Sequence, residues 1–183
     1  MAGHLRIVGG RWRGRRLTFP DAGGVRPTAD RIRETLFNWL QPVVPGARCL
    51  DLFAGSGGLG LEALSRGAAE VVFVERDRRL ADQLRANLET LGAEGARVVQ
   101  QDARTYLKGP CRPFDLVFLD PPFRRGALDA LCQELAAGGW LAPGARVYLE
   151  HEAEAGPPDL PAGWELLRSK KAGQVGYHLA AVP

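Results

Sequence analysis

Residues 48–75 read RCLDLFAGSGGLGLEALSRGAAEVVFVE, and this stretch decides the fold class. The apolar run 48–53 predicts a strand, a Gly-x-Gly-x-x-Gly loop follows it, and residues 59–67 predict a helix that ends at a glycine. A second apolar run, 70–75, predicts another strand. This order is typical of a βαβ unit in an open α/β sheet, whose loop and helix N-terminus can bind an anionic ligand.

The same alternation of strands and helices continues toward the C-terminus. The expected strands are 96–102, 114–120 and 145–150, and the expected helices are 78–92 and 126–139. Near-continuous apolar strands joined by helices predict a parallel sheet that is covered on both faces. The last two apolar runs, 164–171 and 177–182, are too close for a crossover and predict an antiparallel hairpin. We therefore expect a Rossmann-like α/β fold with seven strands, mostly parallel, and a C-terminal antiparallel hairpin.

The N-terminal part has a different character. Residues 5–19, LRIVGGRWRGRRLTF, predict a small basic β-hairpin. Residues 28–40 predict an amphipathic helix with Thr28 or Asp30 as its N-cap. We place the domain boundary between an arm of residues 1–25 and a main domain of residues 26–183.

The charge of the chain is concentrated in this arm. The net charge is +3, and residues 1–20 contain five arginines and no acid, which leaves 19 basic against 21 acidic residues elsewhere. Such segregation indicates contact with a polyanion such as RNA, although a solvated arm without a partner is the alternative. Trp12 lies among these arginines, far from any apolar run, and is expected to stack on a base. The candidate RNA-binding residues are Arg6, Arg11, Trp12, Arg13, Arg15 and Arg16, with Arg26, Arg124 and Arg125 in later loops.

Composition excludes several classes of protein. The 183 residues contain three cysteines without a CxxC pair, so we expect neither a disulfide framework nor a zinc site, and Cys49 and Cys132 are predicted to pack in the core. No window approaches the ~18 apolar residues of a membrane span, and the N-terminus has no apolar signal segment, which favours a cytoplasmic location. The histidines are scattered without a serine or cysteine partner, so a hydrolase triad is not expected.

Two acidic residues after the glycine loop suggest the ligand. Glu75 ends its strand 20 residues after Gly55, where a carboxylate can accept both hydroxyls of a ribose. Asp102 ends the next strand, where it can accept the amino group of an adenine. These residues predict an adenosine-containing cofactor, for which NAD and S-adenosylmethionine both remain open.

The sequence Asp120-Pro121-Pro122-Phe123 follows the strand at 114–120 and lies at the same sheet edge. Two prolines remove two N–H donors, so this loop offers acceptors only. The Asp120 carboxylate and the Pro121 carbonyl can accept the two hydrogens of an amine, which directs its lone pair at an electrophilic methyl group. Phe123 offers a flat face on which an extruded base can stack. The motif therefore favours methyl transfer to an amine.

The chain resembles the RsmD-type 16S ribosomal RNA guanine-N2 methyltransferases over nearly its whole length. The similar stretches are GGRWRGRRL (9–17), VRPTADRIRETLFNWL (25–40), CLDLFAGSGGLGLEALSRGA (49–68), VFLDPPFRRG (117–126) and AGQVGYHL (172–179). The resemblance implies a class I methyltransferase fold, S-adenosylmethionine as cofactor, no metal, and a monomer that acts on 16S rRNA in an assembled or partly assembled small subunit. The cofactor contacts that we expect are Asp51, Phe53, Gly55, Ser56, Gly57, Glu75, Arg76, Asp102 and Ala103; the guanine contacts are Asp120, Pro121, Pro122 and Phe123.

Other functions remain open from the residues themselves. The motif at Asp120 does not name the amine, so adenine N6 in nucleic acid and glutamine N5 are alternatives to guanine N2. An NAD-dependent oxidoreductase would share the glycine loop, but nothing in the sequence supplies its hydride-transfer acid. An RNA-binding module without activity would keep the arm but would have no reason to keep Asp120.

Overall fold

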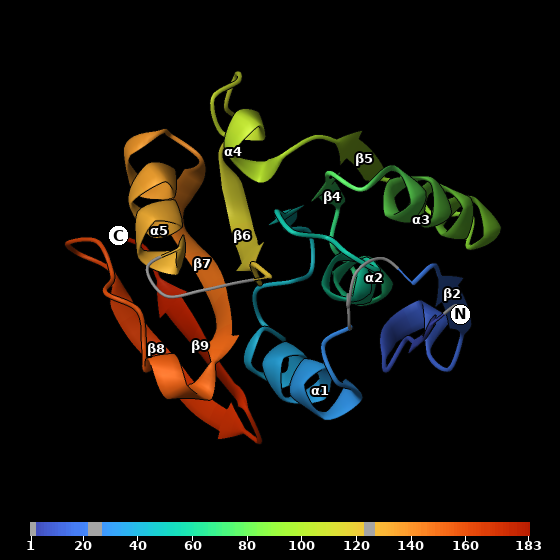
Figure 1. The fold of residues 1–183 in the computed structure, drawn as a ribbon, viewed down its shortest axis with the longest axis horizontal. Coiled ribbons are helices and arrows are strands. Elements are labelled where there is room, and N and C mark those ends of the chain that lie inside the picture. The colour runs from blue at the N-terminus through green and yellow to red at the C-terminus, as the bar shows by residue number, and fades with distance from the viewer. Residues whose placement is uncertain (1–2, 22–26, 123–126) are drawn as a thin grey trace.

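The computed structural model describes residues 3–21, 27–122 and 127–183. One sheet of seven strands, in the order β5-β4-β3-β6-β7-β9-β8, crosses the molecule (Figure 1). Its strands are β3 (Arg48–Asp51), β4 (Glu70–Glu75), β5 (Ala96–Gln100), β6 (Phe114–Leu119), β7 (Leu141–Glu152), β8 (Glu165–Ala172) and β9 (Val175–Ala181). β3 pairs in parallel with β4 and β6, β5 and β7 extend this parallel set, and β9 runs antiparallel to β7 and β8. The predicted sheet and its C-terminal hairpin are confirmed.

Helices cover both faces of the sheet, as the continuous apolar strands require. On one face α1 (Asp30–Trp39), α2 (Gly58–Ser65) and α3 (Arg78–Thr90) bury one apolar cluster, in which the rings of Phe37 and Phe118 lie 5.9 Å apart. On the other face α4 (Ala103–Tyr106) and α5 (Ala127–Ala137) cover a second cluster around Trp140. The order of the strands reverses at β3, which lies between β4 and β6. The connections on the two sides of β3 therefore run in opposite directions and leave a crevice at the carboxyl ends of these strands.

Several predicted boundaries need correction. β7 begins at Leu141 rather than at residue 145, and the short helix α4 was absent from the sequence-based prediction. The N-cap of α1 is Ala29, not Thr28 or Asp30. The Thr28 hydroxyl instead donates to Glu150 Oε1 at 3.3 Å, so a tertiary contact replaces the expected cap.

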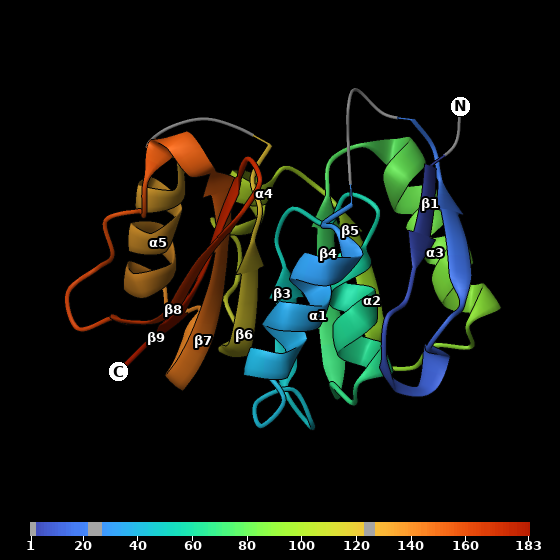
Figure 2. The same cartoon turned by 90° about the horizontal axis from the view of Figure 1, so that it is seen from below.

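The predicted N-terminal hairpin is present as β1 (Gly3–Arg6) and β2 (Arg16–Phe19), joined through a 3-10 turn, η1 (Gly10–Trp12). Figure 2 shows it standing beside α3, and η1 contacts α2. Its inward side chains, including Leu5 and Leu17, belong to the same apolar cluster as α2 and α3. The hairpin is therefore packed on the main domain, and the boundary after residue 25 stays a prediction.

Two histidines meet, contrary to the sequence-based expectation. The pairing of β7 with β9 brings His151 Nε2 within 2.7 Å of His178 Nε2, and Ser169 Oγ lies 2.7 Å from His178 Nδ1. Burial and, second, the charge of the nearby His151 lower the pKa of His178 to about 4. His151 Nδ1 contacts the Glu152 carbonyl oxygen rather than a carboxylate, so the arrangement is not a hydrolase triad.

Cys49 and Cys132 are buried, as predicted, and the three cysteines are free. Within residues 3–21, 27–122 and 127–183, no helix has the length and apolar character to cross a membrane.

Candidate active site

The loop between β3 and α2 has a backbone shape that requires glycine at two positions. Gly55 has a φ of +55° and Gly57, the N-cap of α2, has a φ of +86°, both in the left-handed region that favours glycine. A Cβ on Gly57 would also approach Leu84 Cδ1 to 2.5 Å. The loop therefore turns tightly and presents the N-terminus of α2, with its unpaired N–H groups, to the crevice.

Asp51, the last residue of β3, lies beneath this loop. Its Oδ2 accepts the N–H of Gly60 at 3.0 Å, and the residue is 2% exposed. The pKa of Asp51 is raised to about 7, chiefly by burial; the Gly60 N–H lowers it, and the charge of Glu75 raises it. A cation bound nearby would favour the ionised carboxylate. Asp51 is therefore suited to face a positively charged ligand group.

Glu75, the last residue of β4, is fixed by two backbone N–H groups. Oε1 accepts from Gly55 at 2.9 Å and Oε2 accepts from Asp77 at 2.7 Å. Each carboxylate oxygen has more than one acceptor site, so both can still accept hydroxyl groups of a ligand. The two bonds hold the carboxylate in one orientation against the glycine loop.

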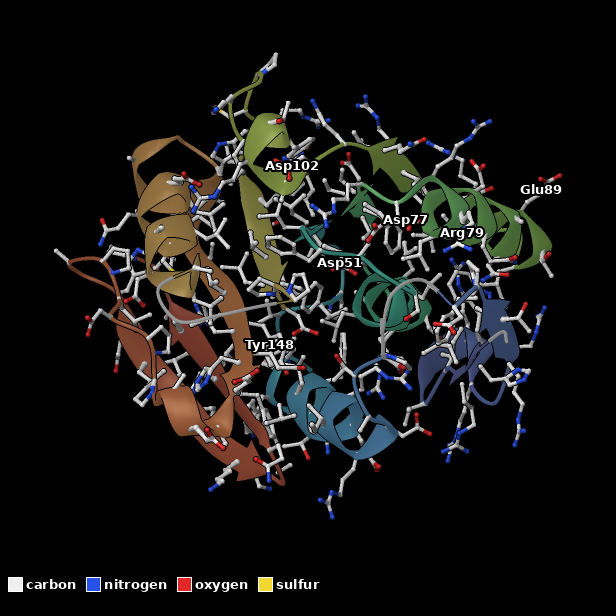
Figure 3. The ribbon with its side chains drawn as sticks, viewed as in Figure 1. Asp51, Asp77, Arg79, Glu89, Asp102 and Tyr148 are labelled. Carbon is white, nitrogen blue, oxygen red and sulfur yellow. The ribbon has the colours of Figure 1, made fainter. Side chains whose placement is uncertain are left out.

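Asp102 is the N-cap of α4. Its Oδ2 accepts the N–H groups of Arg104 at 3.1 Å and of Thr105 at 3.2 Å, and the residue is exposed. Both capping bonds end on one oxygen, which leaves Oδ1 for a ligand. Figure 3 shows Asp51 and Asp102 at this edge of the sheet.

A cleft of about 620 Å³ connects these groups with the end of β6. This volume is in the range of small-molecule sites. The predicted cofactor residues that line it are Asp51, Phe53, Gly55, Ser56, Glu75, Arg76, Asp102 and Ala103, whereas Gly57 is buried and is not among the lining residues. The lining residues that the sequence analysis did not assign to the cofactor are Pro27, Thr28, Asp77, Arg79 and Glu150, among others.

The other end of the cleft carries a second acidic group. Asp120 and Glu150 both line it, and their carboxyls are hydrogen-bonded to each other. Burial raises the pKa of both carboxyls, and for Asp120 the charge of Glu150 raises it further. The Tyr148 hydroxyl donates to Glu150 Oε1 at 2.7 Å. Sequence reasoning missed Glu150, although it was visible as the acid that ends the strand after the Asp-Pro-Pro motif.

Four predicted contacts, Arg26, Phe123, Arg124 and Arg125, lie outside the described residues. Pro121 is buried, and Pro122 is exposed and lines the cleft. In the described part of the chain, no group of three or more His, Cys, Asp or Glu side chains could hold a metal ion.

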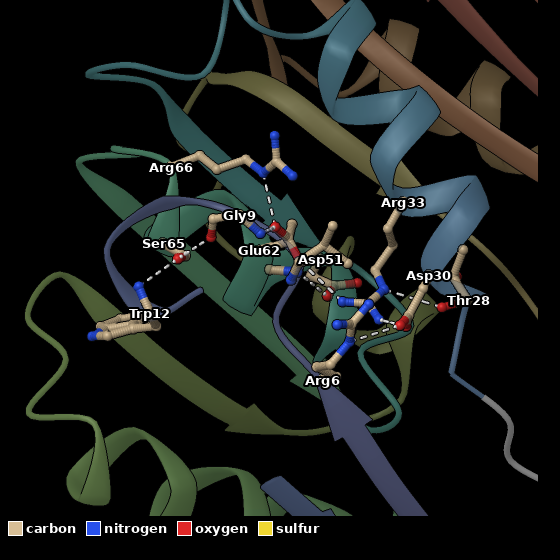
Figure 4. A network of polar contacts seen from close by, with 12 residues as sticks. Arg6, Gly9, Trp12, Thr28, Asp30, Arg33, Asp51, Glu62, Ser65 and Arg66 are labelled. Carbon is tan, nitrogen blue, oxygen red and sulfur yellow. Dashed lines mark hydrogen bonds and ion pairs between the residues drawn. The ribbon is translucent and has the colours of Figure 1, made fainter. Parts of the chain in front are cut away.

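A buried ion network fastens the hairpin to the domain (Figure 4). Glu62 in α2 is fully buried and accepts the N–H groups of Val8 and Gly9 at 2.9 and 2.8 Å. It also binds Arg33 Nη1 at 3.0 Å and Arg66 Nε at 2.8 Å. Glu62 thus ties the hairpin to α1 and α2 at once.

The prediction that Trp12 stacks on RNA assumed that no apolar surface buries this side chain, and that assumption is wrong. The Trp12 side chain is 7% exposed and belongs to the apolar cluster. The segment is held there because η1 packs against α2 and the backbone N–H of Trp12 donates a hydrogen bond to Ser65 Oγ at 3.0 Å. The Arg11 guanidinium lies 4.3 Å from the centre of its ring. Little of this ring is left for a base. The five arginines of the hairpin are exposed, and Arg6 pairs with Asp30 at 3.1 Å.

Comparison with known proteins gives the family. The model of a family described as "Conserved hypothetical protein 95" matches residues 5–181. The chain is 55% identical to the ribosomal RNA small subunit methyltransferase D of Escherichia coli strain K12, over 97% of this chain and 90% of the relative.

Solved structures agree with that assignment. A putative methyltransferase, yhhF, from Escherichia coli is 53% identical, with a TM-score of 0.92 and 98% coverage of both chains. A 16S rRNA N2 G1207 methyltransferase of T. thermophilus, in complex with AdoMet and guanosine, is 27% identical; its TM-score is 0.70, and all of this chain matches 50% of it. The chain therefore belongs to the family of the ribosomal RNA small subunit methyltransferase D.

Proposed function

We propose that this protein transfers a methyl group from S-adenosylmethionine to the exocyclic N2 amine of a guanine in 16S ribosomal RNA. The observation that carries the proposal is that one cleft joins the glycine loop and its carboxylates to Asp120 at the end of β6. A family of ribosomal RNA methyltransferases and a structural neighbour bound to AdoMet and guanosine support it.

The residues of the cleft fit this cofactor. S-adenosylmethionine supplies an electrophilic methyl group on a positively charged sulfur. Asp51 offers a buried carboxyl that a cation would ionise, and Glu75 offers two fixed oxygens for the ribose hydroxyls. Asp102 keeps one oxygen for the adenine amino group. Phe53, Ser56, Arg76 and Ala103 form the walls around these groups.

At the other end, Asp120 and the Pro121 carbonyl would accept the hydrogens of the guanine amine and fix its lone pair toward the methyl carbon. The amine nitrogen would bond the methyl carbon as the sulfur–methyl bond breaks and S-adenosylhomocysteine leaves, and the pair of carboxyls, Asp120 and Glu150, can take the proton that the amine releases. Such a site works by positioning and by electrostatic stabilisation. Phe123 is assigned a stacking contact with the base.

We assign residues 1–25 to RNA binding and residues 26–183 to methyl transfer. Arg13, Arg15 and Arg16 are exposed, and in the described ranges they form no ion pair, which leaves their charges for phosphates. A ribosomal substrate implies a cytoplasmic location and an assembled or partly assembled small subunit as the partner. One chain supplies both the cofactor end and the base end of the cleft, and we propose that the protein acts as a monomer.

Transfer of tritiated methyl groups tests the proposal. The substrates are small subunits and naked 16S rRNA from a strain whose RNA lacks the modification, and mass spectrometry identifies the product nucleoside. N2-methylguanosine is the expected product. N6-methyladenosine, methylated glutamine in a ribosomal protein, or no transfer at all would each overturn it. Comparing the two substrates shows whether the assembled subunit is required.

A further inference from the structure

Two acidic residues on neighbouring strands meet at the acceptor end of the cleft. β6 and β7 are parallel, and their register pairs Leu119 with Leu149, so the next positions, Asp120 and Glu150, lie side by side. Residues in register on adjacent strands point to the same face of a sheet. This pairing brings the two carboxyls together over the cleft that both of them line.

The Glu150 side chain is held in place by hydroxyl groups. Tyr148 Oη donates to Oε1 at 2.7 Å, and Thr28 Oγ1 donates to the same oxygen at 3.3 Å. Thr28 is itself fixed, because its carbonyl oxygen accepts from Nε of the buried Arg33 at 3.1 Å. Both hydroxyl groups donate to Oε1, and neither of them occupies Oε2, the other oxygen of the carboxyl that neighbours Asp120.

Two carboxyls placed together in a partly buried site repel each other when both are ionised, and a shared proton or a bound hydrogen-bond donor relieves that repulsion. Burial raises the pKa of both groups, and the pair titrates as a unit. Strongly perturbed carboxyls of this kind concentrate at functional sites. The ligand that suits such a pair presents two or more hydrogen-bond donors close together.

We propose that Glu150 is a specificity-determining residue that accepts the N1–H of the target guanine, beside Asp120, which accepts from the N2 amine. This inference rests on the proposed function and deepens it. Guanine carries a hydrogen on N1 next to its N2 amine, whereas the adenine amine lies next to an unprotonated N1. A carboxylate at this place therefore matches guanine and would meet the lone pair of adenine N1.

A change of substrate and a change of residue together isolate this contact. 2-Aminopurine keeps the amine at position 2 but has an unprotonated N1. Glu150→Gln keeps an oxygen for the hydroxyls of Tyr148 and Thr28, which orients its amide NH₂ to the place of Oε2. That NH₂ can donate a hydrogen bond to N1 of 2-aminopurine, whereas against guanine it would face the N1–H, which is also a donor.

The assay uses small subunits reconstituted with RNA that carries guanine or 2-aminopurine at the methylated position. We expect the wild type to prefer guanine by about 100-fold in kcat/KM, the upper end of what one hydrogen bond to a charged group contributes. Glu150→Gln should reduce this preference at least tenfold. Glu152→Gln, an exposed acid on the same strand, is the matched control and should keep the wild-type preference.

Affinity for S-adenosylhomocysteine and the melting temperature show whether Glu150→Gln is folded with an intact cofactor site. If the folded variant loses activity equally on both bases, or keeps the wild-type preference, the inference is overturned while the proposed function stands. If the wild type does not methylate guanine in this RNA, the proposed function fails first. Should Glu150→Gln unfold, Thr28→Val provides the second test, because it removes one of the two hydroxyls that hold Glu150 Oε1 and should weaken the preference for guanine without changing cofactor affinity.

Discussion

Replacing Glu62 by glutamine tests whether the buried ion network holds the hairpin on the domain. Four donors converge on this fully buried carboxylate: two backbone N–H groups and the guanidinium groups of Arg33 and Arg66. Glutamine has one acceptor oxygen instead of two and no charge, so it leaves the Arg33 guanidinium, which is 1% exposed, partly uncompensated. Breaking one partner of a buried pair costs about 3–5 kcal/mol.

The lower end of that range applies here, because Arg33 Nη2 also pairs with Asp30 at 2.5 Å. We expect a loss of about 3 kcal/mol in the free energy of unfolding. A domain of this size loses about 2–4 °C in melting temperature per kcal/mol, so the expected decrease is roughly 6–12 °C. Urea titration followed by tryptophan fluorescence and thermal melting measure the two quantities.

Asp82→Asn is the matched control, because it removes charge from an exposed pair with Arg85 and should cost less than about 1 kcal/mol. A loss below about 1 kcal/mol for Glu62→Gln would refute the reasoning and leave apolar packing as the attachment of the hairpin. The deletion of residues 1–19 would also remove core side chains such as Leu5 and Leu17 and uncover the rest of the apolar cluster to which they belong. Point substitutions of surface arginines are therefore the sharper test of RNA binding.

Three further predictions concern the cleft and the hairpin. Asp120→Ala should reduce kcat at least tenfold, which corresponds to about 1.4 kcal/mol, and a smaller reduction contradicts the contact of Asp120 with the amine. The substitution should not lower the stability of the fold, because it removes one of two adjacent carboxyls. Glu75→Ala should weaken S-adenosylhomocysteine binding by about 1–3 kcal/mol in calorimetry, because charge-assisted bonds to the ribose are lost; an unchanged Kd removes Glu75 from the cofactor site. Replacing Arg13, Arg15 and Arg16 by alanine should flatten the slope of log affinity for RNA against log salt by about two units, at ~0.7 per contact. Filter binding across a salt series measures that slope, and an unchanged slope means that these arginines do not contact phosphates.

The sequence predicts the sheet and the cofactor end of the cleft well, because their signals are local. The glycine loop at Gly55 and the acid at Glu75 belong to one strand–loop–helix–strand unit, and their spacing alone brings them together. Asp102 follows for the same reason, since a residue that ends a parallel strand reaches the same edge.

The errors concern contacts between residues far apart in the chain. Trp12 is surrounded by arginines in sequence, yet its backbone N–H donates a hydrogen bond to Ser65 Oγ, 53 positions away. Thr28 looks like a helix cap, but its hydroxyl bonds Glu150, 122 positions away. Glu150 itself gains meaning only from the register that sets it beside Asp120. Amphipathic periodicity reports which face is buried, and it does not report which distant side chain completes a polar contact.

The arrangement of charge explains why one short chain needs both a basic hairpin and an acidic cleft. The carboxyl ends of the parallel strands, or the helices directly after them, bring five acids to one edge, namely Asp51, Glu75, Asp102, Asp120 and Glu150. Such an acidic edge attracts the positively charged sulfur of the cofactor and accepts hydrogen bonds from the N–H groups of a base, but it repels phosphates. The hairpin stands on the far side of α2 from β6 (Figure 1), and its exposed arginines can hold the RNA backbone away from the carboxylates. A nucleotide that leaves its stack can then reach the cleft with its base while its neighbours stay on the basic surface. The separation of charge therefore favours a single extruded base over a paired one as the substrate.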